Sequence, residues 1–133
     1  MGQCLFDSRL NLIALDVRVD GIGERSVALR MVVDTGASFT IISWSAAEAL
    51  GYHPERSPRR IQFMMGSGRE AAPMFTVKAI EAVGVTLGHI PVLCHDLPQG
   101  SLVDGLLGIS FLRHGRLAID FQRGILQLER RAR

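Results

Sequence analysis

An aspartate that follows an apolar stretch is the strongest chemical signal in the sequence. Residues 31–33 are Met-Val-Val, and Asp34, Thr35 and Gly36 follow them directly. A carboxylate beside a hydrophobic core stays ionised when it accepts hydrogen bonds, and the Thr35 hydroxyl and the backbone amides near Gly36 can donate them. The same short pattern occurs at ordinary strand ends, so the tripeptide by itself leaves a purely structural turn open.

A second turn built from large apolar residues and glycine lies far downstream. Leu106 and Leu107 precede Gly108, and the residues that follow predict a short helix. Between the two turns, the segment 66–68 reads Gly-Ser-Gly and comes directly after a strand-like stretch. Because glycine tolerates unusual backbone angles, this segment predicts a projecting and mobile hairpin.

These three segments, in this order and spacing, resemble the retropepsin-like aspartic peptidases of the bacterial type, the single-domain relatives of retroviral proteases. The resemblance extends from about Leu10 to Leu128. It implies a mostly β, closed, barrel-like acid-protease fold with one or two short helices, in a single domain over residues 1–133. It also implies that the chain is an aspartic endopeptidase acting on peptide or protein substrates.

The resemblance assigns roles to individual residues. Asp34 matches the catalytic aspartate, Thr35 the residue whose hydroxyl bonds across a subunit boundary, and Gly36 the residue that lets the substrate backbone approach. The substrate-binding residues that it implies are Gly66, Ser67, Gly68 and Leu106, and Ala37 beside the catalytic turn is expected to join them. Met65, beside the hairpin tip, is expected to pack as a flexible apolar lid over the substrate, with plain hairpin packing as the alternative. Ser38 and Ile109 stand where retroviral enzymes usually carry Asp and Arg, so the ion pair of those enzymes is absent here.

The number of candidate carboxylates predicts the assembly. Aspartic peptide hydrolysis needs one ionised carboxylate to accept a proton from water and one protonated carboxyl to donate to the substrate carbonyl. This chain has one Asp-Thr-Gly, and Asp104 precedes Gly-Leu instead. We therefore expect a homodimer that activates water between two Asp34 carboxylates, with no metal or organic cofactor. A noncatalytic dimeric protein-interaction module with the same fold is the alternative.

Ala37 bears on the pH range of such a site. Family members with Ser or Thr at this position can donate a further hydrogen bond to the catalytic carboxylate, and Ala cannot. A donor of this kind favours the charged form of the carboxylate. The sequence therefore predicts a less acidic working range than that of pepsin-like enzymes.

Composition excludes other classes of protein. The 133 residues, 47% of them hydrophobic, suit one globular domain, and a net charge of +2 argues against nucleic-acid binding. No apolar run approaches the ~20 residues of a membrane helix, and the start lacks a secretory pattern, so no membrane partner is expected. The two cysteines favour a reducing compartment and a cytoplasmic location. A basic tail over residues 130–133 is predicted to be solvated surface.

Cys94, His95 and Asp96 form the strongest competing cluster. Successive residues of a strand point to opposite faces, so the three cannot converge on one metal or act as a Cys-His nucleophile pair without a turn. A buried Cys94 with an exposed His95 is therefore the expected arrangement.

Alternation of apolar and polar residues predicts the elements that must position the turns. The predicted strands are 10–19, 27–33, 61–65, 74–83, two short strands within 85–93 about Gly88, 117–121 and 125–128. One helix is predicted from the capping-box spacing of Ser45 and Glu48 to its end at Gly51, and a second over 110–114, closed by Gly115. The Pro-rich segment 53–60 is predicted to be a surface connection.

Overall fold

The structure is a computed structural model that describes residues 2–130. Residues 1 and 131–133 lie outside the described part, and with them most of the predicted basic tail. The elements are β1 (Gly2–Leu5), β2 (Ala14–Asp20), β3 (Ser26–Val33), β4 (Ile41–Ile42), α1 (Trp44–Ala49), the 3₁₀ helix η1 (Pro54–Arg56), β5 (Arg60–Met65), β6 (Gly68–Ala82), β7 (Val85–Cys94), β8 (Gly105–Leu107), α2 (Ile109–Leu112), β9 (Gly115–Asp120) and β10 (Ile125–Arg130). No helix within residues 2–130 is long and apolar enough to cross a membrane.

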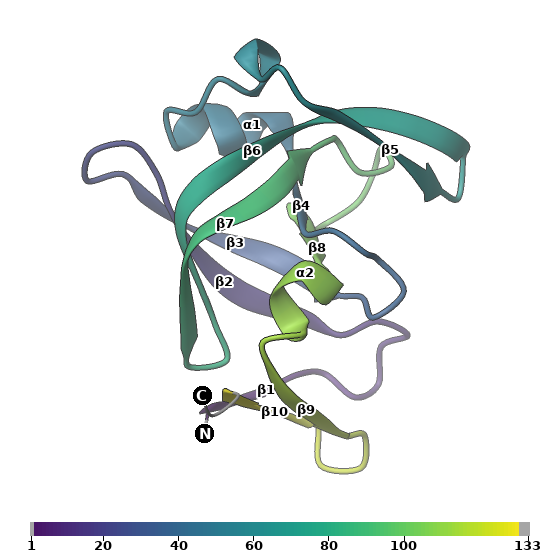
Figure 1. Ribbon diagram of the computed structural model, residues 1–133. Coiled ribbons are helices and arrows are strands. Elements are labelled where there is room, and N and C mark those ends of the chain that lie inside the picture. The colour runs from purple at the N-terminus through teal and green to yellow at the C-terminus, as the bar shows by residue number, and fades with distance from the viewer. Residues whose placement is uncertain (1, 131–133) are drawn as a thin grey trace.

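The main sheet closes into a barrel (Figure 1). Its strand order is β2-β3-β8-β4-β7-β6-β5, and β2 pairs in addition with β6, for example Val19 with Ile80. All strands of this sheet except β5 therefore form a ring. β2 illustrates why the residues fold this way, because Val17 and Val19 are buried while the intervening Arg18 is exposed. The predicted closed, mostly β fold with two short α-helices is confirmed.

β8 is the element that brings the two predicted turns together. It runs parallel to β3, with Val33 opposite Leu107, and antiparallel to β4, with Ile42 opposite Gly105. Parallel neighbours end at the same edge of a sheet. The residues after β3 and those after β8, Asp34 and Gly108, therefore lie side by side.

The hairpin β5–β6 projects from the barrel (Figure 1). Met65 pairs with Gly68, which leaves Gly66 and Ser67 as the turn, and Gly68 has a φ of +115° that favours glycine. β6 extends over 15 residues and pairs with β5 first, then with β7 and, near its end, with β2. The predicted hairpin is confirmed, and its second strand begins earlier than the predicted Met74.

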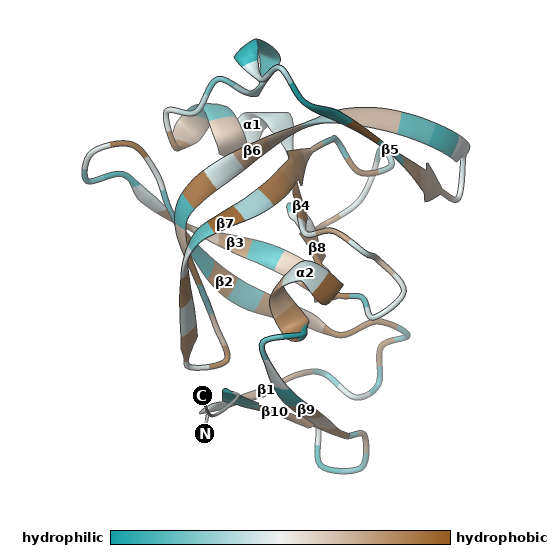
Figure 2. Ribbon diagram, viewed as in Figure 1, coloured by the Kyte–Doolittle hydropathy of each residue, from teal (hydrophilic) through white to brown (hydrophobic). Residues whose placement is uncertain are grey.

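The hydrophobic core fills the barrel and continues under α2 (Figure 2). Met31, Ile80 and Leu107 are fully buried within the barrel strands, and Phe111 of α2 is fully buried against them. Burying a side chain of this size contributes about 1.5–3 kcal/mol, so packing of Phe111 helps to fix the short α2 to the barrel.

Several predicted boundaries are wrong. β2 begins at Ala14, because residues 8–12 form turns and bends. Helix α1 is capped by Ser43, whose hydroxyl accepts a hydrogen bond from Ala46 N at 3.2 Å, whereas the predicted cap Ser45 already lies inside the helix. The second helix ends at Leu112, and Gly115 starts β9 because it pairs with Arg130.

Two strand predictions also differ from the structure. Gly88 does not turn the chain: β7 is continuous, because β6 pairs with it in one register on both sides, Ala79 with Gly88 and Val77 with Ile90. β1 was not predicted, and it pairs with β10 in a small sheet of order β1-β10-β9. Its short sequence has no signal of its own, because the partner strand lies at the other end of the chain.

Candidate active site

Asp34 lies in a tight turn at the end of β3. Its carboxylate oxygen Oδ1 accepts a hydrogen bond from Gly36 N at 2.9 Å, and its carbonyl accepts one from Ala37 N at 3.2 Å. Its own amide donates to the Leu107 carbonyl at 3.0 Å, which fixes the turn to β8. Asp34 is partly exposed, while Thr35 is exposed and its hydroxyl makes no hydrogen bond with any residue in 2–130. The turn therefore presents a carboxylate and a free hydroxyl at the surface.

Two glycines allow the turn and its neighbour to pack backbone against backbone. A Cβ on Gly36 would lie 3.2 Å from Asp34 Oδ1, and one on Gly108 would lie 2.4 Å from the Phe39 carbonyl and 2.7 Å from that of Ala37. The second contact is far inside van der Waals distance, so no side chain fits at position 108. Gly108 is thus required for the close approach of the two segments.

Backbone hydrogen bonds join α2 to the loop after Asp34. Ile109 N donates to the Ala37 carbonyl at 2.8 Å, and Ser110 N donates to the Ser38 carbonyl at 3.1 Å. The same segments are the ones in which Ser38 and Ile109 replace the ion pair expected of retroviral enzymes. In this chain, backbone hydrogen bonds connect the two segments that an ion pair is expected to join in retroviral enzymes.

Thr40 anchors the loop and was missed by sequence reasoning. It is fully buried, and it is the one buried polar or charged residue within the described chain. Its Oγ1 accepts a hydrogen bond from Gly108 N at 3.2 Å, and its amide donates to Ser110 Oγ at 2.9 Å. The only sequence signal is a hydroxyl residue before the apolar pair Ile41-Ile42, which is common at ordinary strand starts.

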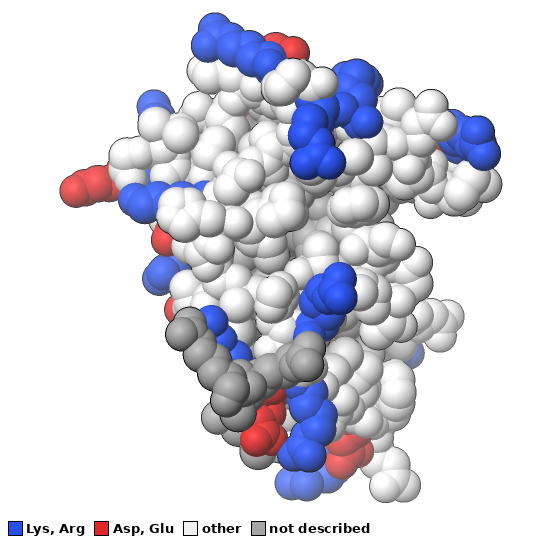
Figure 3. Space-filling model, in the orientation of Figure 1, with Lys and Arg blue, Asp and Glu red and all other residues white. Residues whose placement is uncertain are grey.

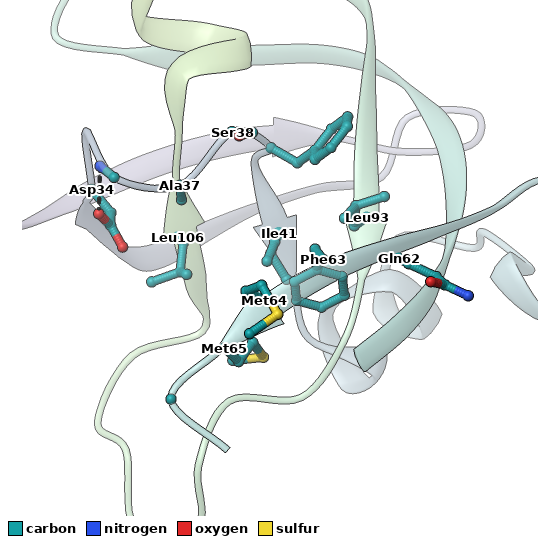
Figure 4. A pocket seen from close by; sticks show the side chains of 13 residues that line it. Asp34, Ala37, Ser38, Ile41, Gln62, Phe63, Met64, Met65, Leu93 and Leu106 are labelled. Carbon is teal, nitrogen blue, oxygen red and sulfur yellow. Dashed lines mark hydrogen bonds between the residues drawn. The ribbon is translucent and has the colours of Figure 1, made fainter. Parts of the chain in front are cut away.

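A pocket of about 550 Å³ lies between the Asp34 turn and the β5–β6 hairpin. It is lined by Asp34, Gly36, Ala37, Ser38, Phe39, Ile41, Gln62, Phe63, Met64, Met65, Gly66, Leu93 and Leu106. Figure 4 shows Asp34 on one side of this pocket, Ile41, Phe63 and Leu93 on the other, and Leu106 between them. Most of the lining is apolar, and Asp34 is the only carboxylate in it among residues 2–130.

The structure brings most of the predicted site residues to this pocket. The ones that line it are Asp34, Gly36, Ala37, Met65, Gly66 and Leu106. Thr35, Ser67 and Gly68 lie in the same two turns and are not part of the lining. The roles of all nine in catalysis and substrate binding stay predictions.

Sequence reasoning did not assign the apolar wall of the pocket. Ile41 and Leu93 face it from β4 and β7, which pair in parallel with these two residues opposite each other. Phe39 and Phe63 complete the wall from the active loop and from β5. Each is an ordinary apolar residue in its own segment, so only the pairing of distant strands marks it as part of a site.

Comparison with known proteins identifies the family. Residues 15–111 match the family model described as aspartyl protease. The chain belongs to this aspartyl protease family. No curated protein sequence gives a significant match.

Solved structures of two proteases and of a protease-like domain share the fold. A retropepsin-like aspartic protease from Rickettsia conorii superposes with a TM-score of 0.70 at 21% identity, covering 96% of this chain and 89% of that one. The retroviral protease-like domain of Ddi1 from Leishmania major gives a TM-score of 0.58 at 17% identity, with 90% and 89% covered. The EIAV protease, complexed with the inhibitor HBY-793, gives a TM-score of 0.56 at 19% identity, covering 77% of this chain and 86% of that one. The resemblance to retropepsin-like proteins is confirmed at the level of the fold.

The other aspartates of this aspartyl protease chain have structural partners. Asp104 Oδ2 accepts a hydrogen bond from Arg30 N at 2.9 Å, and Asp96 Oδ1 accepts one from Trp44 N at 3.0 Å. Asp7, Asp16 and Asp20 form ion pairs with arginines, and Asp120 accepts from Arg123 N. None of them lines the pocket beside Asp34.

The competing Cys94-His95-Asp96 cluster holds no metal-binding group of three ligands within the described residues. Cys94 is fully buried as predicted, and burial raises the pKa of its thiol to about 12, with the negative charges of Asp96, Glu48 and Glu55 adding to the effect. His95 is only a quarter exposed, because its ring packs edge-on against Phe63 with centroids 5.4 Å apart. A thiolate nucleophile is therefore disfavoured at this position.

Proposed function

We propose that this chain is an aspartic endopeptidase that acts as a homodimer, with water activated between the Asp34 carboxylates of its two protomers. The observation that carries this proposal is the pocket beside Asp34, in which the described residues supply a single carboxylate. The chemistry of the family's reaction uses two carboxyl groups that share one site. A twofold axis through the Asp34 turns supplies the second one.

The reaction proceeds through a tetrahedral intermediate. The ionised Asp34 accepts a proton from the water as its oxygen attacks the peptide carbonyl, and the protonated Asp34 of the other protomer donates to the carbonyl oxygen. The intermediate collapses as the C–N bond breaks: the carboxyl that took the water proton gives it to the leaving nitrogen, and the other carboxylate takes a proton from a hydroxyl of the intermediate as the carbonyl forms again. The hydrogen bond from Gly36 N to Asp34 Oδ1 holds the carboxylate in place throughout.

Exposed groups near the turn support a symmetric interface. The Thr35 hydroxyl has no partner within residues 2–130 and is available to the other protomer. Large apolar side chains are exposed on the terminal sheet and on the loop after β1, namely Leu5, Leu10, Leu12 and Phe121. This loop is tied to the active strand, because Val33 N donates to the Ile13 carbonyl at 2.8 Å. Exposed apolar surface of this kind favours association.

The apolar wall of the pocket indicates the substrate. Ile41, Phe63 and Leu93 form a surface that buries hydrophobic side chains. Discrimination of about 1–3 kcal/mol per pocket follows from such burial. We expect the protein to cleave between large hydrophobic residues and to cleave poorly where a charged residue lies beside the scissile bond.

The decisive experiment compares three proteins on a peptide library with mass-spectrometric readout. The wild type should cleave peptides. Asp34→Asn keeps the shape and removes the ionisable group, so it should be inactive with an unchanged circular dichroism spectrum. Asp16→Asn is the control, because Asp16 is an exposed aspartate on β2 outside the pocket. Undiminished cleavage by Asp34→Asn would overturn the proposal.

The assembly is tested by dilution. Activity per chain should fall with the dimer fraction measured by sedimentation, and Thr35→Ala should weaken the dimer by about 1 kcal/mol if its hydroxyl bonds across the interface. A fully active monomer would contradict the shared site. A stable dimer that cleaves no peptide would favour the noncatalytic interaction module.

A further inference from the structure

A second pocket of about 540 Å³ lies between β7, α2 and the end of β10, separate from the pocket beside Asp34. Four basic or titratable side chains line it: His89, Arg113, His114 and Arg130. No acidic side chain lines it among residues 2–130. Figure 3 shows basic side chains at the position of α2, on the face turned toward the viewer.

The basic side chains of this second pocket have no acidic neighbour in its lining among residues 2–130. Within residues 2–130, the side chains of His89, Arg113 and His114 make no hydrogen bond or ion pair with another residue. Elsewhere arginines do pair, as Arg30 with Asp16 at 3.2 Å and Arg116 with Glu129 at 2.8 Å. The Arg113 charge can attract an anion to this concave surface, and the ring N–H groups of His89 and His114 can donate hydrogen bonds to it.

The backbone at His89 is unusual. Its φ is +52°, the left-handed region that favours glycine, in the middle of the continuous strand β7. The pairs on either side, Ala79–Gly88 and Val77–Ile90, keep one register, but the ladder lacks the Lys78–His89 pair between them, and Lys78 N donates to the Tyr52 hydroxyl at 2.8 Å. Uncommon backbone angles at residues other than glycine often mark functional sites.

The remaining lining suits an organic group. Pro91 contributes exposed apolar surface beside the basic side chains, while Leu87 and Ile90 line the pocket with side chains that are largely buried. A phosphate ester carries about two negative charges and three strong acceptor oxygens. It can therefore accept hydrogen bonds from several donors at once, and more of them than a single carboxylate can. Arginine also binds phosphate through two parallel hydrogen bonds.

We propose that this second pocket binds a phosphorylated small molecule, with the phosphate on Arg113 and the two imidazoles and the organic part on the apolar residues. The proposal does not depend on peptidase activity. The second pocket is nevertheless connected to the hydrogen bonds that position the Asp34 turn. Ser110 lines the pocket, and the Ser110 hydroxyl forms a hydrogen bond with Thr40. A ligand there would lie against Ser110, which belongs to the network that joins α2 to the loop after Asp34.

The test is a titration of the full chain with phenyl phosphate, followed by NMR of the backbone amides and the histidine rings. We expect saturable shifts centred on residues 88–90 and 110–114, weakened by salt because the attraction is electrostatic. Arg113→Gln should lower the affinity at least about tenfold, and Arg59→Gln, an exposed arginine outside both pockets, by less than about twofold.

A second variant separates binding from folding. His89→Gly removes the imidazole and fits the left-handed backbone, so it should lower the affinity while keeping or raising stability. Equal losses for Arg113→Gln and Arg59→Gln, or shifts spread over surface arginines, would overturn the proposal. Tighter binding of benzoate than of phenyl phosphate would also overturn it, because the pocket would then be a site for carboxylates. Tighter binding of a Glu-rich peptide would overturn it as well, because the ligand would then be a protein.

Discussion

The hydroxyl of Ser110 donates a hydrogen bond to the hydroxyl of Thr40 over 3.1 Å and accepts one from the Thr40 amide over 2.9 Å. This pair joins α2 to the loop that carries Asp34. Gly108 N completes it by donating to Thr40 Oγ1 at 3.2 Å. Because Thr40 is fully buried, these groups depend on one another for hydrogen bonding, and the active turn is positioned by a side chain that does not line its pocket.

Replacing Thr40 by valine tests this network. Thr40→Val keeps the shape and removes the acceptor of Gly108 N and of the Ser110 hydroxyl, so the free energy of unfolding should fall by about 1–3 kcal/mol. Urea denaturation measures the change. Ser38→Ala removes an exposed hydroxyl from the same loop and should cost less than about 0.5 kcal/mol. Equal costs for the two variants would show that the network contributes nothing.

A pair of glycine substitutions tests the close approach of the two turns. Gly108→Ala places a Cβ 2.4 Å from the Phe39 carbonyl and should destabilise the protein by about 3 kcal/mol or more. Gly66→Ala is the matched control, because nothing lies within 4 Å of its added Cβ. Thermal unfolding measures the stability of both variants. A Gly108→Ala protein as stable as the wild type would contradict the close backbone approach at Gly108.

Ala37 sets the expected pH dependence of activity. In Ala37→Ser the new hydroxyl can donate to the carboxylate of Asp34 and stabilise its charge, so the bell-shaped profile of kcat/KM should move to lower pH. Ala28→Ser, on an exposed position of β3, should leave the profile in place. A profile that stays fixed or moves upward in Ala37→Ser would remove the electrostatic argument.

The tip of the β5–β6 hairpin should exchange its amide hydrogens fastest among the strands of the main sheet. Gly66 and Ser67 are exposed, and the one side-chain hydrogen bond at the tip runs from Ser67 Oγ to Glu70 at 3.2 Å. Strand β3 pairs on both sides and should be protected. Hydrogen exchange with and without a peptide inhibitor measures both, and we expect the tip to gain protection on binding. Equal protection of tip and β3 in the free protein would contradict this.

Cys94 should be inert in the native protein. Burial raises the pKa of its thiol to about 12, so deprotonation, and with it alkylation, is suppressed around neutral pH. Iodoacetamide should therefore leave Cys94 unmodified in the folded chain and modify it after unfolding, as judged by mass spectrometry. Peptidase activity should resist the reagent, and rapid inactivation through Cys94 would instead point to a thiol nucleophile.

Features that depend on local chemistry can be predicted from the residues alone. Asp34, Thr35 and Gly36 form a turn after an apolar strand, and the Gly-Ser-Gly segment forms a hairpin, because both follow from residue type and short-range backbone preference. Gly51 likewise ends α1 in a left-handed conformation, with a φ of +82°. Local signals placed the helix without fixing its first residue, since the capping-box spacing favours Ser45, whereas the backbone of the preceding loop makes Ser43 the cap.

Only the tertiary structure decided which distant segments meet. β1 pairs with β10 from the far end of the chain, β8 separates β3 from β4, and β7 passes through Gly88 without turning because β6 pairs with it on both sides of that residue. These pairings place Thr40 in the core and set Ile41 against Leu93 in the wall of the pocket. A strand gains its hydrogen bonds and most of its buried surface from its neighbours, so residues that look ordinary in sequence acquire a place in the site only when the barrel closes.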